Sequence, residues 1–329
     1  MPIETLSKKP SKKILTDIQH CDFSSLQALK VKDPHFHWSS VIYEKTGDTA
    51  LHVAARLGHL TVIDYLLEEY APQTVDVRNQ NDKTPLHEAA QFGQWESVVK
   101  LLSYGAEVNA LRRGDWTPLM LACTKIQPVI NLKIVKLLVE KGAYINMPNK
   151  DGWTCVHILA REGGVDVLHY LINQGLNVCP KTKNGRTALH IAALHGNIEI
   201  LDMVLEHLDI NSKDSCGNTA LHEGLLGQHV HVAKHLVSRG ASTDCRNNSD
   251  FSVLHLAASQ NNCEVMDYVL RELSFEINCQ NSNGWSALHC AARKRNEKVF
   301  CYLKNMGADL ALKDRFGRTA LDYFTEVKA

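Results

Sequence analysis

The sequence predicts an all-α repeat solenoid, built from about nine copies of one helix-pair unit. The first observation is a tetrapeptide of the form Thr-Ala/Pro-Leu-His, which occurs four times and returns in five degenerate copies. The second is its spacing, because successive copies begin 35, 33, 37, 33, 32, 33, 34 and 33 residues apart. A fixed period of this length indicates stacked units that bury their apolar faces against one another. The copies begin at Thr49, Thr84, Thr117, Thr154, Thr187, Thr219, Ser252, Ser286 and Thr319.

Each copy opens with a predicted helix capped by its Thr or Ser, whose hydroxyl can accept a hydrogen bond from a free backbone N–H. Pro85 and Pro118 follow their caps directly, in the first turn, where a missing N–H costs nothing. Paired small residues such as Ala54 and Ala55 then let neighbouring helices approach closely. Six residues after the motif histidine, a left-handed residue is expected to end the helix. That position holds Gly58, Gly93, Gly163, Gly196 and Asn261.

A second helix follows in each copy, as the apolar pairs Val62-Ile63 and Leu66-Leu67 indicate. Glycines are expected to stop this helix as well, at Gly105, Gly142, Gly175, Gly240 and Gly307. Between one helix pair and the next, the turn-forming residues predict a short β-hairpin finger, such as Asn149–Gly152.

The ends of the chain depart from the repeat, and they set the predicted domain boundaries. Residues 1–40 are expected to form a basic tail and a degenerate N-terminal capping unit, with apolar residues at roughly helical spacing from Ile14. Residues 41–329 are expected to form the solenoid itself. Its last copy has room for one helix only, so a half-unit cap closed by Tyr323 and Phe324 is expected, or else a truncated chain.

The motif carries a family resemblance. Thr84-Pro85-Leu86-His87 followed by Ala89 matches the T-P-L-H-x-A signature of ankyrin repeats. Residues 41–329 therefore resemble the ankyrin-repeat family, which implies a protein-interaction scaffold. In that family the motif histidine bridges adjacent loops by hydrogen bonds. The resemblance thus implies a structural role for His52, His87, His157, His190, His222, His255 and His289.

Composition and motifs exclude several classes of function. Lys and Arg number 36, as do Asp and Glu, so the basic footprint of a nucleic-acid-binding protein is missing and no direct nucleic-acid binding is expected. No stretch approaches the ~18 apolar residues of a membrane span, and no signal peptide follows Met1. We expect a monomeric cytoplasmic protein with reduced cysteines, and the basic run at Lys8–Lys13 leaves nuclear entry open.

A metal site and a turnover enzyme are both unexpected. The motif histidines lie one repeat apart, about 10 Å, whereas zinc ligands must lie about 2 Å from one ion. His231 and His235 have the spacing of an H-E-x-x-H site but lack its glutamate. No Ser-His-Asp set, P-loop or carboxylate pair is found, so we expect no catalytic residue, no cofactor and no metal.

The finger tips of copies three to five hold the candidate binding residues. The residue before the cap is aromatic in four of nine copies, although aromatic residues make up 7% of the chain. Trp and Arg are enriched in binding hot spots. Together these tips predict a basic, aromatic strip about 30 Å long, unless each Trp packs on its own finger and the charges are merely solvated. The strip comprises Arg112, Arg113, Trp116, Lys150, Trp153, Lys181, Lys183 and Arg186.

A narrower resemblance names a partner. Residues 112–124, in which Met120 replaces the motif histidine, and residues 149–163 resemble an ankyrin-repeat group associated with alanyl-tRNA synthetase. This resemblance implies that synthetase as the partner, and a role in limiting serine mischarging. Lysine side chains would accept serine that has been misactivated as the adenylate. The candidate acceptors are Lys150, then Lys183 or Lys181, whereas Arg113 stands where a lysine is expected.

A guanidinium stays protonated, so Arg113 cannot serve as the amine, although it can still bind a partner. The alternative function is that of a generic ankyrin adaptor. Such an adaptor would bind a protein or peptide through its fingers and concave face. Both alternatives rest on protein–protein contact and differ in whether a lysine is acylated.

Overall fold

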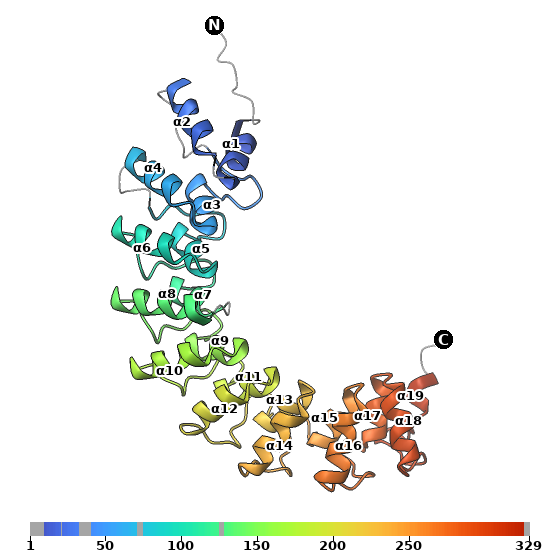
Figure 1. Ribbon diagram of the computed structural model, residues 1–329. Coiled ribbons are helices and arrows are strands. Elements are labelled where there is room, and N and C mark those ends of the chain that lie inside the picture. Colours follow the sequence, from blue (N-terminus) through green and yellow to red (C-terminus); the bar gives the residue numbers. More distant parts are fainter. Residues whose placement is uncertain (1–9, 21, 33–40, 71–74, 125–127, 326–329) are drawn as a thin grey trace. The chain divides into compact units, whose positions relative to one another are not determined.

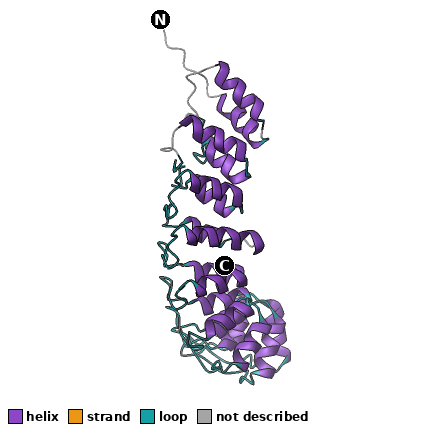
Figure 2. Ribbon diagram, turned by 60° about the vertical axis from the view of Figure 1, so that its left-hand side comes forward, coloured by secondary structure: helices purple, strands orange, loops and turns teal. Residues whose placement is uncertain are grey.

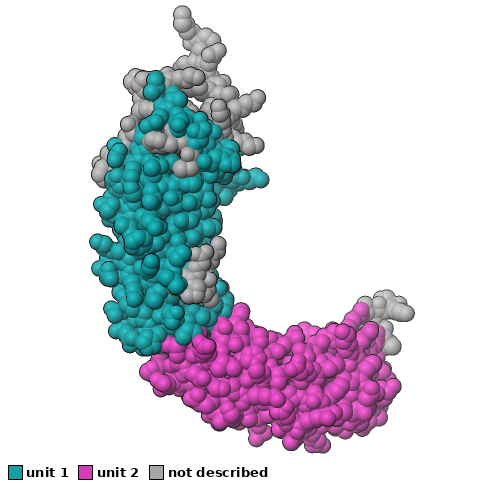
Figure 3. Space-filling model, viewed as in Figure 1, with its two compact units in different colours: residues 1–176 teal, residues 177–329 magenta. Residues whose placement is uncertain are grey.

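The computed structural model describes residues 10–20, 22–32, 41–70, 75–124 and 128–325 (Figure 1). Within these residues the chain consists of helices joined by loops and contains no strand (Figure 2), which confirms the predicted all-α repeat solenoid. The chain divides into two compact units, unit 1 (Met1–Leu176) and unit 2 (Asn177–Ala329) (Figure 3). Each repeat adds one first-row helix, which follows the cap, and one second-row helix.

Unit 1 begins with two helices that precede the first full repeat, and the N-terminal one, α1, packs against α3. Ile14, Leu15 and Ile18 of α1 are buried, as their spacing predicts. The helices of unit 1 are α1 (Pro10–Gln19), α2 (Phe23–Lys32), α3 (Ala50–Leu57), α4 (Leu60–Tyr70), α5 (Pro85–Gln91), α6 (Trp95–Ser103), α7 (Pro118–Ala122), α8 (Pro128–Glu140), α9 (Cys155–Glu162) and α10 (Val165–Asn173).

Unit 2 repeats the same pattern and ends on a short helix, α19. The Phe324 ring of α19 stands edge-on to Phe300, with ring centroids 4.9 Å apart, and the Tyr323 hydroxyl donates to Asp314 at 2.5 Å. The helices are α11 (Ala188–His195), α12 (Ile198–Leu205), α13 (Ala220–Leu226), α14 (Val230–Ser238), α15 (Val253–Ser259), α16 (Cys263–Asp267) with the π-helix η3 (Tyr268–Glu272), α17 (Ala287–Arg293), α18 (Glu297–Asn305) and α19 (Asp322–Thr325).

The motif histidine ties each repeat to the next. The Thr84 N–H donates to Nδ1 of His87 at 3.1 Å, so the ring proton sits on Nε2, which donates to the Trp116 carbonyl at 3.1 Å. Burial lowers the pKa of His87 to about 4, and the ring is therefore neutral at neutral pH. The implied structural role is thus confirmed for His87. The same Nε2 contact to the next repeat is made by His52, His190, His255 and His289.

The expected helix-ending glycines adopt left-handed backbone conformations, as at Gly58 (φ 81°) and Gly163 (φ 83°). The prediction for Asn261 is wrong. There α15 ends at Ser259, Gln260 is extended (φ −94°, ψ 145°), and the Asn262 side chain caps the next helix by accepting from the Glu264 N–H at 2.9 Å. An Asx cap on the following helix thus replaces a left-handed end on the preceding one.

The fingers are tight turns with isolated bridges in place of the expected β-hairpins. In copy four, the Asn149 N–H donates to the Trp153 carbonyl at 2.8 Å, and Asn149 Oδ1 accepts from the N–H groups of Asp151 and Trp153, each at 2.9 Å. The turn closes within five residues, which leaves no length for a ladder. Consecutive fingers are also joined, since the Lys150 N–H donates to the Gly114 carbonyl at 3.0 Å.

Candidate protein-interaction surface

The finger of copy three is held together by its own arginine and tryptophan. The Arg112 guanidinium lies 4.9 Å from the centroid of the Trp116 ring, and the Arg112 N–H donates to the Trp116 carbonyl at 3.0 Å. Burial lowers the pKa of Arg112, and the charge of Glu88 opposes this effect. Trp116 therefore packs on its own finger, as the alternative to a free recognition surface expects. Arg113, by contrast, is exposed, and it donates to the Gln80 carbonyl at 3.3 Å.

The finger of copy four presents the leading acceptor candidate. The Lys150 side chain is 65% exposed, and its Nζ lies 3.9 Å from Oδ1 of Asp115, an acidic neighbour that the strip of cations did not lead us to expect. Trp153 is half-buried, with the Arg161 guanidinium 5.4 Å from its ring centroid. Lys150 thus projects into solvent, whereas Trp153 covers the first-row helix of its own repeat.

In unit 2, the corresponding finger places Lys181 and Lys183 at the surface and Arg186 in an internal ion-pair network. Arg186 Nη2 lies 3.0 Å from Glu223, and its Nε lies 3.6 Å from Asp214. Burial raises the pKa of Glu223, and the charge of Arg186 opposes this effect. Arg186 is therefore less available to a partner than we expected.

The structure brings the predicted site residues together in two groups, one in each unit. Arg112, Arg113, Trp116, Lys150 and Trp153 share adjacent fingers of unit 1, and Lys181, Lys183 and Arg186 share one finger of unit 2. A continuous strip through all three fingers remains a prediction. Within unit 1, the exposed cationic residues of this set are Arg113 and Lys150, on fingers joined by a backbone hydrogen bond.

An ion-pair network around Glu88 in copy two was not predicted from the alignment of the finger residues. Glu88 follows the motif histidine and is buried, with Oε2 2.8 Å from Arg56 and Oε1 2.9 Å from Lys83. Arg56 also contacts Asp48 at 2.5 Å. Burial would raise the pKa of Glu88, but Arg56 and Lys83 outweigh it and the pKa lies below its usual range. A Glu directly after the motif histidine, found again at Glu223, was the signal available in the sequence.

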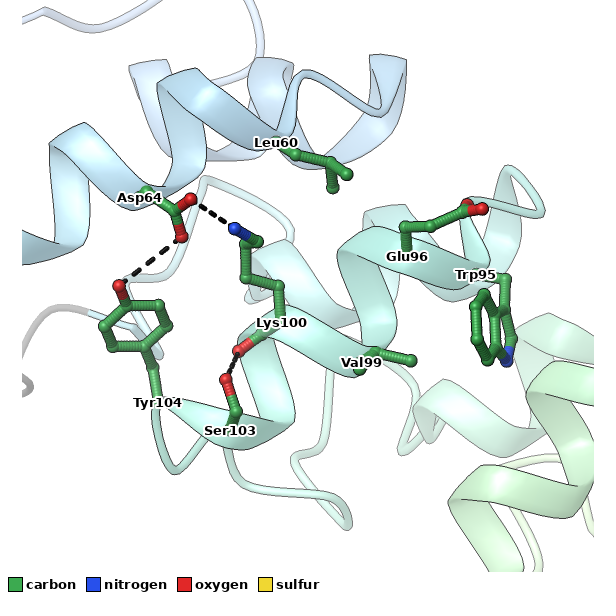
Figure 4. A pocket seen from close by; sticks show the side chains of 8 residues that line it. All are labelled: Leu60, Asp64, Trp95, Glu96, Val99, Lys100, Ser103 and Tyr104. Carbon is green, nitrogen blue, oxygen red and sulfur yellow. Dashed lines mark hydrogen bonds and ion pairs between the residues drawn. The ribbon is translucent and has the colours of Figure 1, made fainter.

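A shallow pocket of about 360 Å³ lies between the second-row helices α4 and α6. Figure 4 shows Lys100 and Tyr104 directed at Asp64, with which Lys100 forms an ion pair. The Trp95 ring borders the pocket and has the Lys133 ammonium 5.9 Å from its centroid. The polar end of this pocket is thus occupied by internal contacts, which leaves Trp95 and Val99 as its exposed apolar part.

Among the described residues, no group of three or more His, Cys, Asp or Glu side chains could hold a metal ion. His235 contacts Asp202 of α12 instead, with Nε2 2.8 Å from the carboxylate. Each cysteine in the described part of the chain is a free thiol. None of the described helices combines the length and the apolar character that crossing a membrane requires.

Comparison with known proteins agrees with this architecture. A family model described as ankyrin repeats (3 copies) matches residues 18–112, 129–214, 173–247, 203–280 and 254–325. The chain is 27% identical to ankyrin repeat and KH domain-containing protein mask-1 of Caenorhabditis elegans over 256 residues, 68% of this chain and 10% of that protein. It is 40% identical to the probable E3 ubiquitin-protein ligase XBOS31 of Oryza sativa subsp. japonica over 87 residues, 26% of this chain and 19% of that protein.

A third relative is the transient receptor potential cation channel subfamily A member 1 of Homo sapiens, 32% identical over 117 residues, 35% of this chain and 10% of that protein. The chain therefore spans between 10% and 19% of the length of these curated relatives. What such different proteins share with this chain is the repeat itself. Repeats of this kind generally mediate protein–protein interaction.

Proposed function

The chain belongs to the ankyrin-repeat family, and from that premise we propose that it is a protein-interaction scaffold whose partner is alanyl-tRNA synthetase. The partner is suggested by the resemblance of residues 112–124 and 149–163 to ankyrin repeat domain-containing protein 16. One structural observation supports it most. Lys150 and Arg113 are both exposed, on two fingers joined by the bond from the Lys150 N–H to the Gly114 carbonyl.

The proposed chemistry is a single acyl transfer to Lys150. The neutral amine attacks the carbonyl carbon of seryl-adenylate, an N–C bond forms, and the bond from that carbon to the phosphate oxygen breaks. AMP leaves with the electron pair, and the nitrogen loses its proton to water. The product is an amide on Lys150, so each acceptor is consumed once. This is a stoichiometric role and not turnover.

The three candidate acceptors differ in their surroundings. Lys150 has its ammonium 3.9 Å from the Asp115 carboxylate, and its finger is joined by a backbone hydrogen bond to the finger that carries the exposed Arg113. Lys181 and Lys183 are exposed in unit 2, beside Arg186, whose guanidinium is engaged by Glu223. The resemblance of residues 149–163 ranks Lys150 first, with Lys183 and Lys181 after it.

The test combines the protein with alanyl-tRNA synthetase, serine and ATP, and maps serine adducts on lysines by mass spectrometry. We expect an adduct at Lys150. The variant Lys150→Arg keeps the charge but lacks a competent amine, so it should still bind the synthetase and lose the adduct. A matched control, Lys141→Arg at the end of α8, should change neither. Conversely, Arg113→Lys should create a new acceptor at the finger where the resemblance expects one.

The outcomes separate the two functions. Synthetase binding without an adduct at Lys150, Lys181 or Lys183 would leave a generic adaptor as the function. Absence of binding would reject this synthetase as the partner. The diversity of the relatives favours the adaptor as the second candidate, because the segment they share with this chain occurs in proteins as different as a probable ubiquitin ligase and a cation channel.

We further propose a monomeric protein located in the cytoplasm. Residues 8 and 9 of the basic run Lys8–Lys13 lie outside the described residues, and the run is the basis for a possible nuclear location. Light scattering of the purified chain tests the oligomeric state, and imaging of a fluorescent fusion, with and without Lys12 and Lys13 changed to Ala, tests the location.

A further inference from the structure

A second candidate binding surface lies in unit 2, and none of the acceptor lysines lines it. A groove of about 580 Å³ opens beside the first-row helices α13, α15 and α17. Its apolar lining is Leu226, Phe251 and Leu256, and its basic lining is Arg293 and Lys294. We call it the Phe251 groove. A space of this size accommodates one or two bulky side chains.

The groove is held in shape by a stack of side chains. The Phe251 and Trp285 rings are stacked, with centroids 5.9 Å apart and planes inclined by 20°, and the Arg293 guanidinium lies 3.9 Å from the Trp285 centroid. The Trp285 carbonyl accepts from His255 Nε2 at 2.9 Å, and its indole N–H points to Asp314 at 3.4 Å. Trp285 is thus fixed at both ends, and it in turn orients Arg293.

The cations at this rim lack carboxylate partners. Within the described part of the chain, no ion pair involves Arg293, Lys294 or Arg295, all of which are exposed. By contrast, ion pairs do engage the following arginines of unit 2: Arg186, Arg239, Arg246, Arg271 and Arg318.

Two acidic residues of this region are engaged by other cations, whereas Glu297, three residues after Lys294, is exposed. Asp250, beside Phe251, pairs with Arg246 at 3.2 Å and accepts from the Ser282 N–H at 2.6 Å. Glu223 of α13 is paired with Arg186. The three cations Arg293, Lys294 and Arg295 outnumber this carboxylate, so the rim carries a net positive charge directly beside an apolar lining.

We propose that the Phe251 groove binds an extended, acidic peptide segment of a partner protein. A bulky apolar side chain of that segment enters the groove beside Leu226 and Leu256. Its carboxylates meet Arg293, whose planar guanidinium suits bidentate contact with a carboxylate, and then Lys294 and Arg295. This function goes beyond the synthetase proposal and does not depend on it.

The dimensions set the length of the segment. Three first-row helices at about 10 Å intervals span about 20 Å, which an extended chain covers in about six or seven residues. A peptide is favoured over a nucleic acid, because the lining is apolar and the Trp285 ring already contacts Phe251 and Arg293, which leaves little of it for base stacking.

The test selects binders of the full chain from a displayed library of random peptides about seven residues long. We expect enrichment of sequences that place Leu, Ile, Phe or Met within three residues of at least two acidic residues. An enriched peptide is then labelled, and its affinity is measured by fluorescence polarisation. The double variant Arg293→Glu and Lys294→Glu should weaken it by about tenfold or more.

Two comparisons make the test specific. A peptide with lysines in place of its acids should bind the double variant about tenfold more tightly than the unaltered protein. The matched control is Lys304→Glu, at an exposed position of α18. It should leave the affinity for the acidic peptide within about twofold, since that charge lies outside the groove. Circular dichroism should show every variant folded, with a slightly lower melting temperature for the double variant, because Arg293→Glu removes the guanidinium from the Trp285 ring.

Several results would overturn the proposal. They are a failure to enrich acidic peptides, an affinity that survives charge reversal at Arg293 and Lys294, and a single-stranded oligonucleotide that binds through these residues more tightly than any selected peptide. None of them would bear on serine adducts at Lys150. The two proposals therefore fail independently.

Discussion

Replacing the motif histidine of copy two tests how much the bridge between repeats contributes to stability. The variant His87→Met is suited to this, because Met120 occupies the same position in copy three and is fully buried there. The substitution thus keeps an apolar side chain that the fold accepts at this site. It removes an acceptor for the Thr84 N–H at 3.1 Å and a donor to the Trp116 carbonyl at 3.1 Å.

Three contacts of the His87 ring are lost, to the Thr84 N–H, to the Thr84 hydroxyl at 2.9 Å and to the Trp116 carbonyl, and they differ in the polar groups they leave behind. The Trp116 carbonyl keeps a second donor, the Arg112 backbone N–H at 3.0 Å. Losing the hydrogen bond from His87 to this carbonyl therefore costs only about 1 kcal/mol. Thr84 is buried, and its N–H is left without an acceptor, which costs about 2 kcal/mol. We therefore expect His87→Met to lower the free energy of unfolding by about 3 kcal/mol.

The assay is urea-induced unfolding, followed by far-ultraviolet circular dichroism and by tryptophan fluorescence. His231→Met is the matched control, because His231 is exposed and its replacement should change stability by less than about 0.5 kcal/mol. A loss below about 1 kcal/mol for His87→Met would refute the reasoning, since it would mean that the Thr84 N–H finds another partner.

Three further predictions concern pH, buried carboxylates and turns. Folding depresses the pKa of His87, His222 and His255 from about 6.5 to about 4. Their contribution to stability is therefore fully present above pH 6.5 and is lost as the pH falls, by roughly 2 kcal/mol per histidine between pH 7 and pH 5. A urea midpoint that does not change over this pH range would contradict this prediction. Glu88→Gln should cost about 2 kcal/mol more than Glu223→Gln in urea unfolding, because two cations lose a carboxylate whose pKa is lowered, and equal losses would show that the pairs are equivalent. Gly185→Ala should lower the melting temperature more than Gly105→Ala, because both are left-handed but only at Gly185 would the new Cβ meet a backbone atom, Ser215 N at 2.7 Å; similar melting temperatures would argue against crowding.

Much of the fold was predictable because it depends on local chemistry repeated at a fixed period. Thr84 and Pro85 indicate the start of a helix through local chemistry alone. Gly58 and Gly163 can each end a helix through the backbone preference of glycine. The failure at Asn261 has the same origin. Asparagine can take a left-handed conformation, but its neighbour Asn262 caps the next helix and draws the chain into an extended path.

The candidate site was less predictable, because register says which residues share a column and not what their side chains contact. Trp116 and Trp153 stand in one column, yet each ring lies against an arginine of its own repeat. Arg186 belongs to the same set, but Glu223, 37 residues later, engages its guanidinium.

The Phe251 groove was not predicted from the sequence for a related reason. Its basic rim lies at the end of a first-row helix, whereas our alignment followed the finger tips, which are neutral in copies six to eight. The absence of carboxylates around Arg293 can be read only from three-dimensional neighbours.

The histidine bridge also has a mechanical consequence. Because His255 reaches only the carbonyl of Trp285, and His289 only that of Arg318, a force applied along the stack of unit 2 would load these bonds one after another. The backbone bonds between fingers, such as that from the Arg315 N–H to the Asn283 carbonyl at 3.1 Å, would share this load, and rupture of each set would release one repeat at a time. Ser252 and Ser286 lie 34 residues apart, so each rupture would lengthen the chain by about 100 Å, the span of one extended repeat less its folded thickness. Pulled from the two ends of its stack, unit 2 would unfold in steps of similar length, one repeat at each step.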